Sequence, residues 1–356
     1  MRVVFVLPCS GKDPIGGLKV VYEYANHLSR RGHEVTLIHA AFQRVDTPIS
    51  EIPRRTLFYW KVWASGKHNP DSWFKIDPKV KMLWVRNLHW RNIPSADAVV
   101  ATSWDTAEWV NRYPATKGTK FYLIQHFETW SGSEDRVSAT WKMPLNKIVI
   151  ARWLEQIATS MNETCCYIPN GLDFAQFGVD VDPAKRSPEH VLMMYHLLDW
   201  KGSQDGLDAL KRARQSIPGL RASTFGVPVA PKGLPDWIDY HRCPPQAKLR
   251  ELYNQAAVFV APSWNEGWGL PASEAMMCGA AVAATDIGGH REFAIHEQTA
   301  LLSPPKNPDA LAANIVRLMS DDPLRIKIAR QGHENIQRFT WDKAVEQLEA
   351  ALTHPR

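Results

Sequence analysis

The stretch AVFVAPSWNEGWGLPASEAMMCGAAVAATDI, residues 257–287, decides the fold. It begins with AVFVAPS, a short apolar run that is typical of a buried strand. Glycines and a proline follow, then a short helical pattern from Pro271 to Cys278, and then a second apolar run, AAVAATDI. A strand, a helix and another strand in this order form a βαβ unit, which predicts a parallel sheet.

The turn inside this unit carries two carboxylates, Glu266 before it and Glu274 just inside the helix. Gly267 and Gly269 allow a sharp turn and close approach of a ligand. Ligands of open α/β sheets bind at the carboxyl ends of strands, and the start of a helix attracts anions. Carboxylates accept hydrogen bonds from hydroxyls, so Glu274 suits a ribose and Glu266 a second polyol. A phosphate between two sets of hydroxyls describes a nucleotide sugar.

Outward from this unit, apolar runs alternate with helical patterns along the chain, which predicts a doubly wound α/β class. The predicted strands are residues 2–8, 33–40, 96–103, 120–126, 190–196, 221–227, 257–263 and 280–287. The predicted helices are residues 18–28, 106–113, 145–158, 205–216, 246–255, 271–278 and 324–353, the last one broken near 339–341.

The length of 356 residues exceeds one ordinary core, so we expect two domains. The first is residues 1–178 and contains a basic, tryptophan-rich segment, residues 54–91. A polar, proline-bearing linker follows at 179–189, because this stretch shows no periodicity. The second domain is residues 190–337, and residues 338–356 form a C-terminal helix.

Composition limits the class of protein to a globular one, with 45% hydrophobic and 22% charged residues. No apolar run approaches the roughly 20 residues that span a bilayer, and the N-terminal run lacks the features of a signal peptide. The five cysteines form no C-x-x-C pair, which supports neither a zinc site nor disulfides and leaves a reducing cytoplasm as the expectation. A net charge of +5 permits anionic partners but does not specify nucleic acid.

The stretch from Pro262 to Glu292, PSWNEGWGLPASEAMMCGAAVAATDIGGHRE, resembles the signature of family 4 glycosyltransferases, with an E-x7-E motif and a following D-x-G-G-x-x-E. The resemblance extends to Gly16–Gly17 with RRGHEVTLI after them, to IPNGLDFAQF at Ile168–Phe177, to Lys201–Gly202 and to the C-terminal helices. Only about residues 43–95 are left unplaced. The resemblance implies a GT-B fold, in which two Rossmann-like domains face across a cleft that holds the donor. The last helix then returns to the N-terminal domain.

The resemblance also implies the chemistry. A sugar would pass from a nucleotide-diphosphate donor to an acceptor with retention of configuration and without a required metal or cofactor. The implied catalytic residues are Glu266, His126 and Lys201. The implied donor-binding residues are Gly16, Gly17, His196, Lys201, Glu266, Gly267, Trp268, Gly269, Leu270 and Glu274. Asp286, Gly288, Gly289 and Glu292 are expected to shape the loop beneath the site.

Three features differ from sequence motifs of known families. In YHLLDWKG, residues 195–202, His196 stands where the family has an arginine that binds the diphosphate. Asp180 and Asp182 imitate a D-x-D metal motif, but they lie in the predicted linker and are not expected to bind metal. The loop CSGKDPIGG, residues 9–17, is neither G-x-G-x-x-G nor a P-loop, because Lys12 precedes the paired glycines.

Several alternatives stay open. The same fold could serve a nucleotide-sugar epimerase or phosphorylase, or a non-catalytic sugar- or lipid-binding relic. The Glu266–Glu274 pair could be a solvated turn and a helix-start carboxylate, Lys201 an exposed loop lysine, and His126 a satisfied strand-end histidine. Gly16–Gly17 could simply start a helix.

The basic, tryptophan-rich segment holds five tryptophans and nine lysines or arginines against two acids. It could be an insertion that packs on the first domain, a contact with an anionic membrane, or a platform for the acceptor. The expected partners are a nucleotide-sugar donor and a glycan or glycolipid acceptor, in surface polysaccharide biosynthesis, and no nucleic acid. The expected location is cytoplasmic, with a peripheral contact at the inner face of the plasma membrane as an option.

Overall fold

The computed structural model describes residues 1–9, 11, 14–66 and 68–355. It divides the chain into two compact units, Met1–Gly171 with Trp341–Arg356, and Leu172–Thr340. Ser10, Lys12, Asp13, Lys67 and Arg356 lie outside the described residues. The comparison of loop 9–17 with a P-loop depended on Lys12, so it stays a sequence argument.

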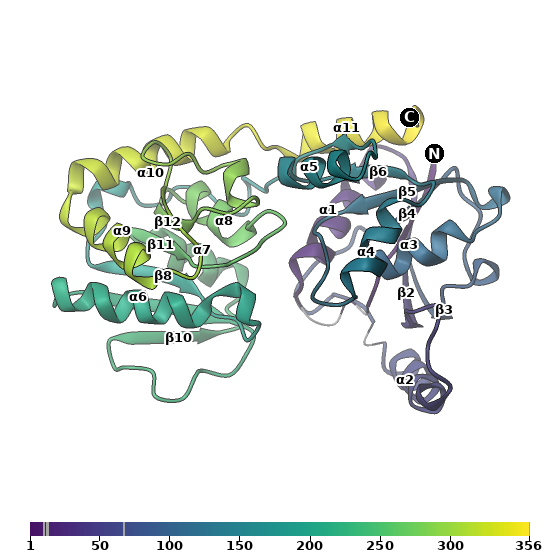
Figure 1. Ribbon diagram of the computed structural model, residues 1–356, viewed down its shortest axis with the longest axis horizontal. Coiled ribbons are helices and arrows are strands. Elements are labelled where there is room, and N and C mark those ends of the chain that lie inside the picture. The colour runs from purple at the N-terminus through teal and green to yellow at the C-terminus, as the bar shows by residue number, and fades with distance from the viewer. Residues whose placement is uncertain (10, 12–13, 67, 356) are drawn as a thin grey trace. The chain divides into compact units, whose positions relative to one another are not determined.

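The first unit is built on a seven-stranded sheet in the order β3-β2-β1-β4-β5-β6-β7 (Figure 1). Neighbouring strands pair in parallel throughout this sheet. The strands are β1 Arg2–Val6, β2 Glu34–Phe42, β3 Lys81–Asn87, β4 Ala98–Ala101, β5 Thr119–Ile124, β6 Asn146–Val149 and β7 Cys166–Tyr167. The helices are α1 Gly16–Arg30, α2 Ile52–Ser65, α3 Trp104–Asn111, α4 Glu134–Trp141, α5 Arg152–Ser160 and α11 Trp341–Thr353.

The second unit repeats this architecture on a six-stranded sheet in the order β10-β9-β8-β11-β12-β13. Its strands are β8 His190–Met194, β9 Arg221–Gly226, β10 Ile238–Arg242, β11 Val258–Ala261, β12 Ala281–Thr285 and β13 Leu301–Ser303. Its helices are α6 Ser203–Ser216, α7 Gln246–Gln255, α8 Leu270–Met277, α9 Pro308–Ser320 and α10 Asp322–Ile336. In both sheets the strand order reverses, between β1 and β4 and between β8 and β11. That is where α/β sheets bind ligands.

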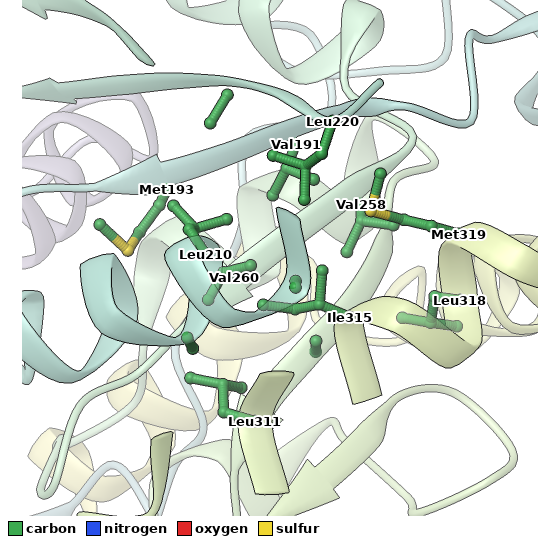
Figure 2. Close-up of a cluster of buried hydrophobic side chains, with 14 of the residues drawn as sticks. Val191, Met193, Leu210, Leu220, Val258, Val260, Leu311, Ile315, Leu318 and Met319 are labelled. Atoms are coloured by element: carbon green, nitrogen blue, oxygen red, sulfur yellow. The ribbon is translucent and has the colours of Figure 1, made fainter. Parts of the chain in front are cut away.

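One buried cluster fixes the strands at the reversal point of the second sheet (Figure 2). Val191 and Met193 of β8 and Val260 of β11 are fully buried, and side chains from α6 and α9 cover them. Leu210 and Ile315 come from these two helices. Burial of each such side chain contributes roughly 1.5–3 kcal/mol. The loops that follow β8 and β11 are therefore anchored on a rigid base.

The prediction of one helix over residues 145–158 is wrong. The structure has strand β6 there, paired with β5 and β7, and helix α5 begins only at Arg152. Ile148 and Val149 are β-branched and buried, which suits an inner strand of a parallel sheet. The apolar run continues into the helical pattern without a Gly or Pro, so the sequence marks no boundary between the two elements.

The predicted linker, residues 179–189, is packed on the second unit, which begins earlier, at Leu172. Arg186 in this stretch is 5% exposed and donates hydrogen bonds to the backbone carbonyls of Tyr253 and Ala256, at 3.2 and 3.0 Å. A guanidinium with several fixed acceptors holds its surroundings rigidly. The division between the units falls at Gly171 rather than inside residues 179–189.

Helix α11 belongs to the first unit, although the second unit precedes it in the chain. Trp341 lies edge-on to Tyr24 and stacks on His27, with ring centroids at 5.1 and 5.6 Å. Glu349 pairs with Arg31 at 2.5 Å and with His33 at 2.7 Å. Aromatic contacts at one end thus hold α11 on α1, and ion pairs at the other end hold it on the residues that follow α1.

Residues 43–95, which the sequence left unplaced, contain α2 and β3. Strand β3 pairs in parallel with β2 and forms one edge of the first sheet. Val62 of α2 packs with Phe42 and Trp84 in a small separate cluster. Of the helices that the structure describes, none combines the length and the hydropathy needed to cross a lipid bilayer.

Candidate functional site

The loops after β8 and β11 place two of the predicted site residues together. These strands are neighbours, with Met193 opposite Val260 in the register. Lys201 ends a short turn after β8, just before α6, and Glu266 lies between β11 and α8. Loops that leave adjacent parallel strands at the same edge of a sheet bring their side chains close.

Lys201 and Glu266 form a partly buried ion pair. The Lys201 ammonium lies 2.8 Å from each oxygen of the Glu266 carboxylate. The Ser263 hydroxyl donates a further hydrogen bond to Glu266 Oε1 at 2.8 Å. Burial alone raises the pKa of Glu266, but the charge and hydrogen bonds of Lys201 outweigh it and leave the pKa below its ordinary value. The carboxylate is therefore ionised and held by a cation beside it.

Helix α8 starts next to this pair, at a glycine that the backbone requires. Gly269 has φ +103, in the left-handed region, and a Cβ there would lie 2.8 Å from the ring of His290. The first N–H groups of a helix have no partner within it and carry partial positive charge. Trp268 is fixed by a hydrogen bond from its indole N–H to the Ser273 hydroxyl, at 3.0 Å. This turn can receive an anion.

Glu274 lies on α8, buried and held by a neutral partner. The Tyr253 hydroxyl, from α7, donates a hydrogen bond to Glu274 Oε2 at 3.0 Å. Tyr253 is fully buried between the rings of Phe177 and Phe259. The rotamer of Glu274 is thus set by a rigid aromatic group.

His290 is a site residue that the sequence analysis missed. Its Nδ1 lies 2.8 Å from the Thr285 carbonyl, so we assign the proton to Nδ1 and the lone pair to Nε2. Burial lowers the pKa of His290, although neighbouring Glu266 opposes this, so the ring is neutral. The signal was present: His290 lies inside the D-x-G-G-x-x-E stretch, between residues assigned only to loop shape.

The residues assigned to loop shape do support the turn. A Cβ on Gly289 would lie 2.5 Å from the Glu266 carbonyl oxygen, so glycine lets the two loops touch. Asp286 accepts two hydrogen bonds from Arg291, at 2.6 and 2.8 Å. The Asp286–Arg291 pair thus stabilises the loop after β12 internally, and Gly289 lets this loop approach the one that carries Glu266.

His196 follows β8 and is tied to the same loop as Lys201. Its ring Nδ1 accepts a hydrogen bond from the Leu198 backbone N–H at 3.0 Å. The backbone N–H of His196 donates to the Ser203 hydroxyl at 2.8 Å. Burial and then the charge of Lys201 lower the pKa of His196, while Glu266 opposes them. The ligand-free ring is therefore neutral at pH 7, with its proton on Nε2.

Asp180 and Asp182 are engaged elsewhere in the second unit. Asp180 accepts hydrogen bonds from Arg250 at 2.7 and 2.6 Å. Asp182 accepts the Ala184 N–H at 2.8 Å and lies 3.5 Å from Arg330. Both carboxylates thus act in packing the residues of the predicted linker.

The remaining predicted residues, Gly16, Gly17 and His126, belong to the first unit. The two glycines begin α1, and the Gln125 side chain donates a hydrogen bond to the Gly17 carbonyl at 3.1 Å. His126 is 8% exposed and lies edge-on to Trp130 and Trp153, with ring centroids at 4.3 and 5.3 Å. The loop after β5 therefore holds the start of α1 and carries a histidine in an aromatic frame.

Comparison with known proteins bears on this arrangement. Residues 182–335, which cover most of the second unit, match the family described as glycosyl transferases group 1. The chain resembles the group 1 glycosyl transferases. The predicted resemblance to family 4 glycosyltransferases is thereby confirmed.

Two curated relatives illustrate the similarity. A D-inositol 3-phosphate glycosyltransferase of Streptomyces bingchenggensis is 35% identical over 112 residues, which are 32% of this chain and 25% of that protein. O-antigen chain mannosyltransferase B of Escherichia coli is 33% identical over 111 residues, which are 31% of this chain and 29% of that protein. The chain thus spans about a quarter of the length of these curated relatives.

Among solved structures, that of HepE from Anabaena in complex with UDP and glucose has a TM-score of 0.74 at 16% identity. The superposition covers 99% of each chain. At this identity the likeness concerns the fold, and it confirms the predicted GT-B class with two Rossmann-like domains.

Proposed function

We propose that the protein is a retaining glycosyltransferase of the hexosyltransferase type. It moves a sugar from a nucleotide-diphosphate sugar to a glycan or glycolipid acceptor. The observation that carries this proposal is the Lys201–Glu266 pair, with 2.8 Å contacts, beside the start of α8. A cation that suits a diphosphate and a carboxylate that suits sugar hydroxyls stand together there.

In this proposal the second unit binds the donor. The diphosphate contacts Lys201 and the backbone N–H groups from Gly267 to Leu270, and so competes with Glu266 for the ammonium. Glu266 then accepts a hydrogen bond from a hydroxyl of the transferred sugar, and Glu274 accepts one from the ribose. The Nε2 lone pair of His290 can accept a further hydrogen bond from a hydroxyl of the donor. His126 and Gly16–Gly17 keep the roles that the family resemblance gives them.

The reaction breaks the bond between the anomeric carbon and the diphosphate oxygen and forms one from that carbon to the acceptor oxygen, on the same face. The bonding electrons leave with the diphosphate, which also takes the proton of the acceptor hydroxyl. Negative charge therefore develops beside Lys201 and the start of α8. One preorganised donor at such a position typically contributes about 10²–10³ in rate. These groups supply the neutralisation that a metal supplies in other enzymes, so we propose that no metal is required.

The proposed setting is surface polysaccharide biosynthesis in the cytoplasm. The relative from Escherichia coli that is named as an O-antigen chain mannosyltransferase supports this choice. None of the five cysteines, all of which lie in the described residues, takes part in a disulfide, which suits a reducing compartment.

A thermal-shift panel of UDP-, GDP- and dTDP-sugars tests donor binding. A donor at one hundred times its dissociation constant adds about 2.7 kcal/mol of stability, so one nucleotide class should raise the melting temperature. Glu274→Ala is the matched variant and should blunt the rise. A panel in which no nucleotide sugar stabilises the protein would refute the proposal.

Turnover with the donor so identified tests the reaction. Product NMR should show the anomeric configuration of the donor, and the rate should survive EDTA. An inverted product would refute retention. Loss of rate on chelation that manganese or magnesium restores would refute metal independence.

A further inference from the structure

The five tryptophans of segment 54–91 differ in their surroundings. Trp73 donates its indole N–H to the Gly11 carbonyl at 2.7 Å and lies against Tyr22. Trp84 is 8% exposed and donates to the Tyr59 carbonyl at 3.0 Å. These two pack on the first unit. Trp60 and Trp63, on α2, are 55% and 60% exposed.

The exposed apolar residues of the described chain concentrate at α2. The large hydrophobic side chains that the structure leaves exposed include six within residues 49–63: Ile49, Ile52, Leu57, Phe58, Trp60 and Trp63. Ile49 and Leu57 are 84% and 70% exposed. Monomeric proteins rarely expose a contiguous apolar patch without a function for it. In Figure 1, α2 stands apart from the other helices of the first unit, beyond the ends of β2 and β3.

Helical spacing separates a packed face of α2 from an exposed one. Val62 packs on Phe42 and Trp84, with Tyr59 beside it. Leu57 and Trp60 lie three residues apart and face away from this cluster, so they form one apolar stripe. The rings of Trp60 and Trp63 meet edge-to-face at 5.7 Å, which holds them together at the surface.

Two cations border this stripe. Arg54 and Lys61 are exposed and lie seven residues apart, so they share one side of the helix. The Arg54 side chain is 75% exposed, and its ion pair with Glu51 is long, at 3.4 Å. A helix with an apolar stripe that contains tryptophan and a basic border is the pattern of helices that lie in the surface of an anionic bilayer.

We propose that α2 binds the surface of an anionic lipid bilayer. Leu57, Trp60 and Trp63 enter the interface, and Arg54 and Lys61 contact lipid phosphates. With 14 residues and a rise of about 1.5 Å each, the helix lies along the membrane and does not cross it. A second copy of the chain fits this face less well, because a symmetric contact would bring like charges together, and charged residues are depleted in interface cores. The proposal does not depend on the transfer reaction.

Vesicle flotation tests the proposal. The full-length protein is mixed at low salt with vesicles of phosphatidylglycerol and phosphatidylcholine, or of phosphatidylcholine alone. We expect binding to the anionic vesicles that weakens with salt, because exposed charges are screened within about 10 Å at 0.1 M. Arg54→Ser with Lys61→Ser should lower partitioning about 30-fold, since each basic residue near an anionic surface contributes about 1 kcal/mol.

Trp60→Ala with Trp63→Ala tests the apolar part and should lower partitioning at least about tenfold. Trp60→Phe with Trp63→Phe should retain most of the binding. Leu197→Ala with Val229→Ala removes apolar side chains that are 68% and 67% exposed on the second unit, and should change nothing. The thermal unfolding of all these variants should match that of the parent, because exposed side chains contribute little to stability.

Two results would overturn the proposal. The first is a parent protein that stays out of the lipid fraction at low salt, or an Arg54→Ser/Lys61→Ser variant and a Trp60→Ala/Trp63→Ala variant that both bind as well as the parent. The second is self-association in sedimentation equilibrium without lipid that the paired tryptophan variant abolishes. That result would make α2 an interface between copies of the chain.

Discussion

Each unit carries a glutamate shortly after a strand, and the pKa values of the two carboxyl groups are shifted in opposite directions. Glu266, after β11, has the Lys201 ammonium 2.8 Å away and a pKa below its ordinary value. Glu128, after β5, is half-buried, and its carboxyl group accepts a hydrogen bond from the Trp104 backbone N–H at 2.7 Å. Burial, with Asp105 close by, raises the pKa of Glu128 to about 8. At neutral pH the first is a carboxylate and the second is an acid.

The difference shows what an adjacent cation does. Both side chains lose water, which disfavours the charged form. A single backbone N–H does not compensate for this loss, whereas an ammonium and a hydroxyl do. A charged carboxylate can accept hydrogen bonds from a polyol at both oxygens, whereas a protonated carboxyl group has an O–H donor and fewer acceptor sites. The comparison therefore separates a proposed ligand-binding glutamate from a structural one, and four experiments test it.

Lys201→Met should have the largest effect, because it gives Glu266 the surroundings of Glu128. Turnover should fall about 10²–10³-fold as the developing charge loses its cation. Glu266 would remain buried without a cation, which costs about 3–5 kcal/mol, and its pKa would rise. Stability should then decline with increasing pH. Initial rates and urea unfolding at pH 5 and 8 measure both effects.

The double variant Lys201→Met with Glu266→Gln should recover stability but not turnover. Lys211→Met, at an exposed lysine of α6, is the control and should leave both unchanged. Turnover within twofold of the parent in Lys201→Met would contradict the role given to the pair.

Glu128→Gln should stabilise the protein at alkaline pH. The native pKa of about 8 exceeds the ordinary 4.5, so the unfolded state binds fewer protons between these values. The contribution of protonated Glu128 to the free energy of unfolding is therefore fully present below about pH 4.5. This contribution is lost as the pH rises through about 8. Glutamine does not ionise. In urea unfolding the variant should match the parent at pH 5 and exceed it by on the order of 3 kcal/mol at pH 8.5. A difference that does not vary with pH would show that Glu128 ionises normally.

Glu274→Ala sharpens the comparison with a third glutamate, one held by the neutral Tyr253 hydroxyl. Hydrogen bonds to a charged group contribute roughly 1.5–3 kcal/mol each, so nucleotide binding should weaken about tenfold to several hundredfold. Calorimetry with the free nucleoside diphosphate measures this. Tyr253→Phe is the control: it removes only the hydroxyl and should cost less. Unchanged affinity in Glu274→Ala would remove this residue from the site.

The smallest expected effect concerns His196 and is a pH dependence of donor affinity. Burial and Lys201 lower its pKa in the free protein, whereas a bound diphosphate would raise it. Donor affinity should be highest at low pH and decline, up to about tenfold, as pH rises through the bound-state pKa. The dissociation constant of a nucleotide sugar from pH 5.5 to 8.5 measures this.

His196→Arg should keep affinity high across that pH range, and His196→Gln should keep it low across the range. The same pH slope in His196→Gln as in the parent would mean that another group titrates.

The sequence predicted most of this fold because the inner strands of a parallel sheet are continuous apolar runs, as in AVFVAPS. It failed at β6, where Ile148 and Val149 run into a helical pattern, and at α2, whose apolar residues face outward. In the candidate site, the residues around the turn predicted Glu266 and Glu274, and the family resemblance implied Lys201. The sequence could not predict the ion pair between Lys201 and Glu266, nor the position of His290 next to the start of α8. Both contacts join loops that are far apart in the chain, so they depend on the folded structure.

The packing of α11 on α1 has a consequence for synthesis of the chain. The first unit is interrupted after Gly171 and resumes at Trp341, after the whole second unit, Leu172–Thr340. At 5–20 residues per second a ribosome needs about 10–30 s for that interval. During that interval the face of α1 that carries Tyr24 and His27 has no covering helix, so the nascent first unit exposes an apolar surface until α11 emerges. A chaperone that binds nascent chains would meet this protein at that face.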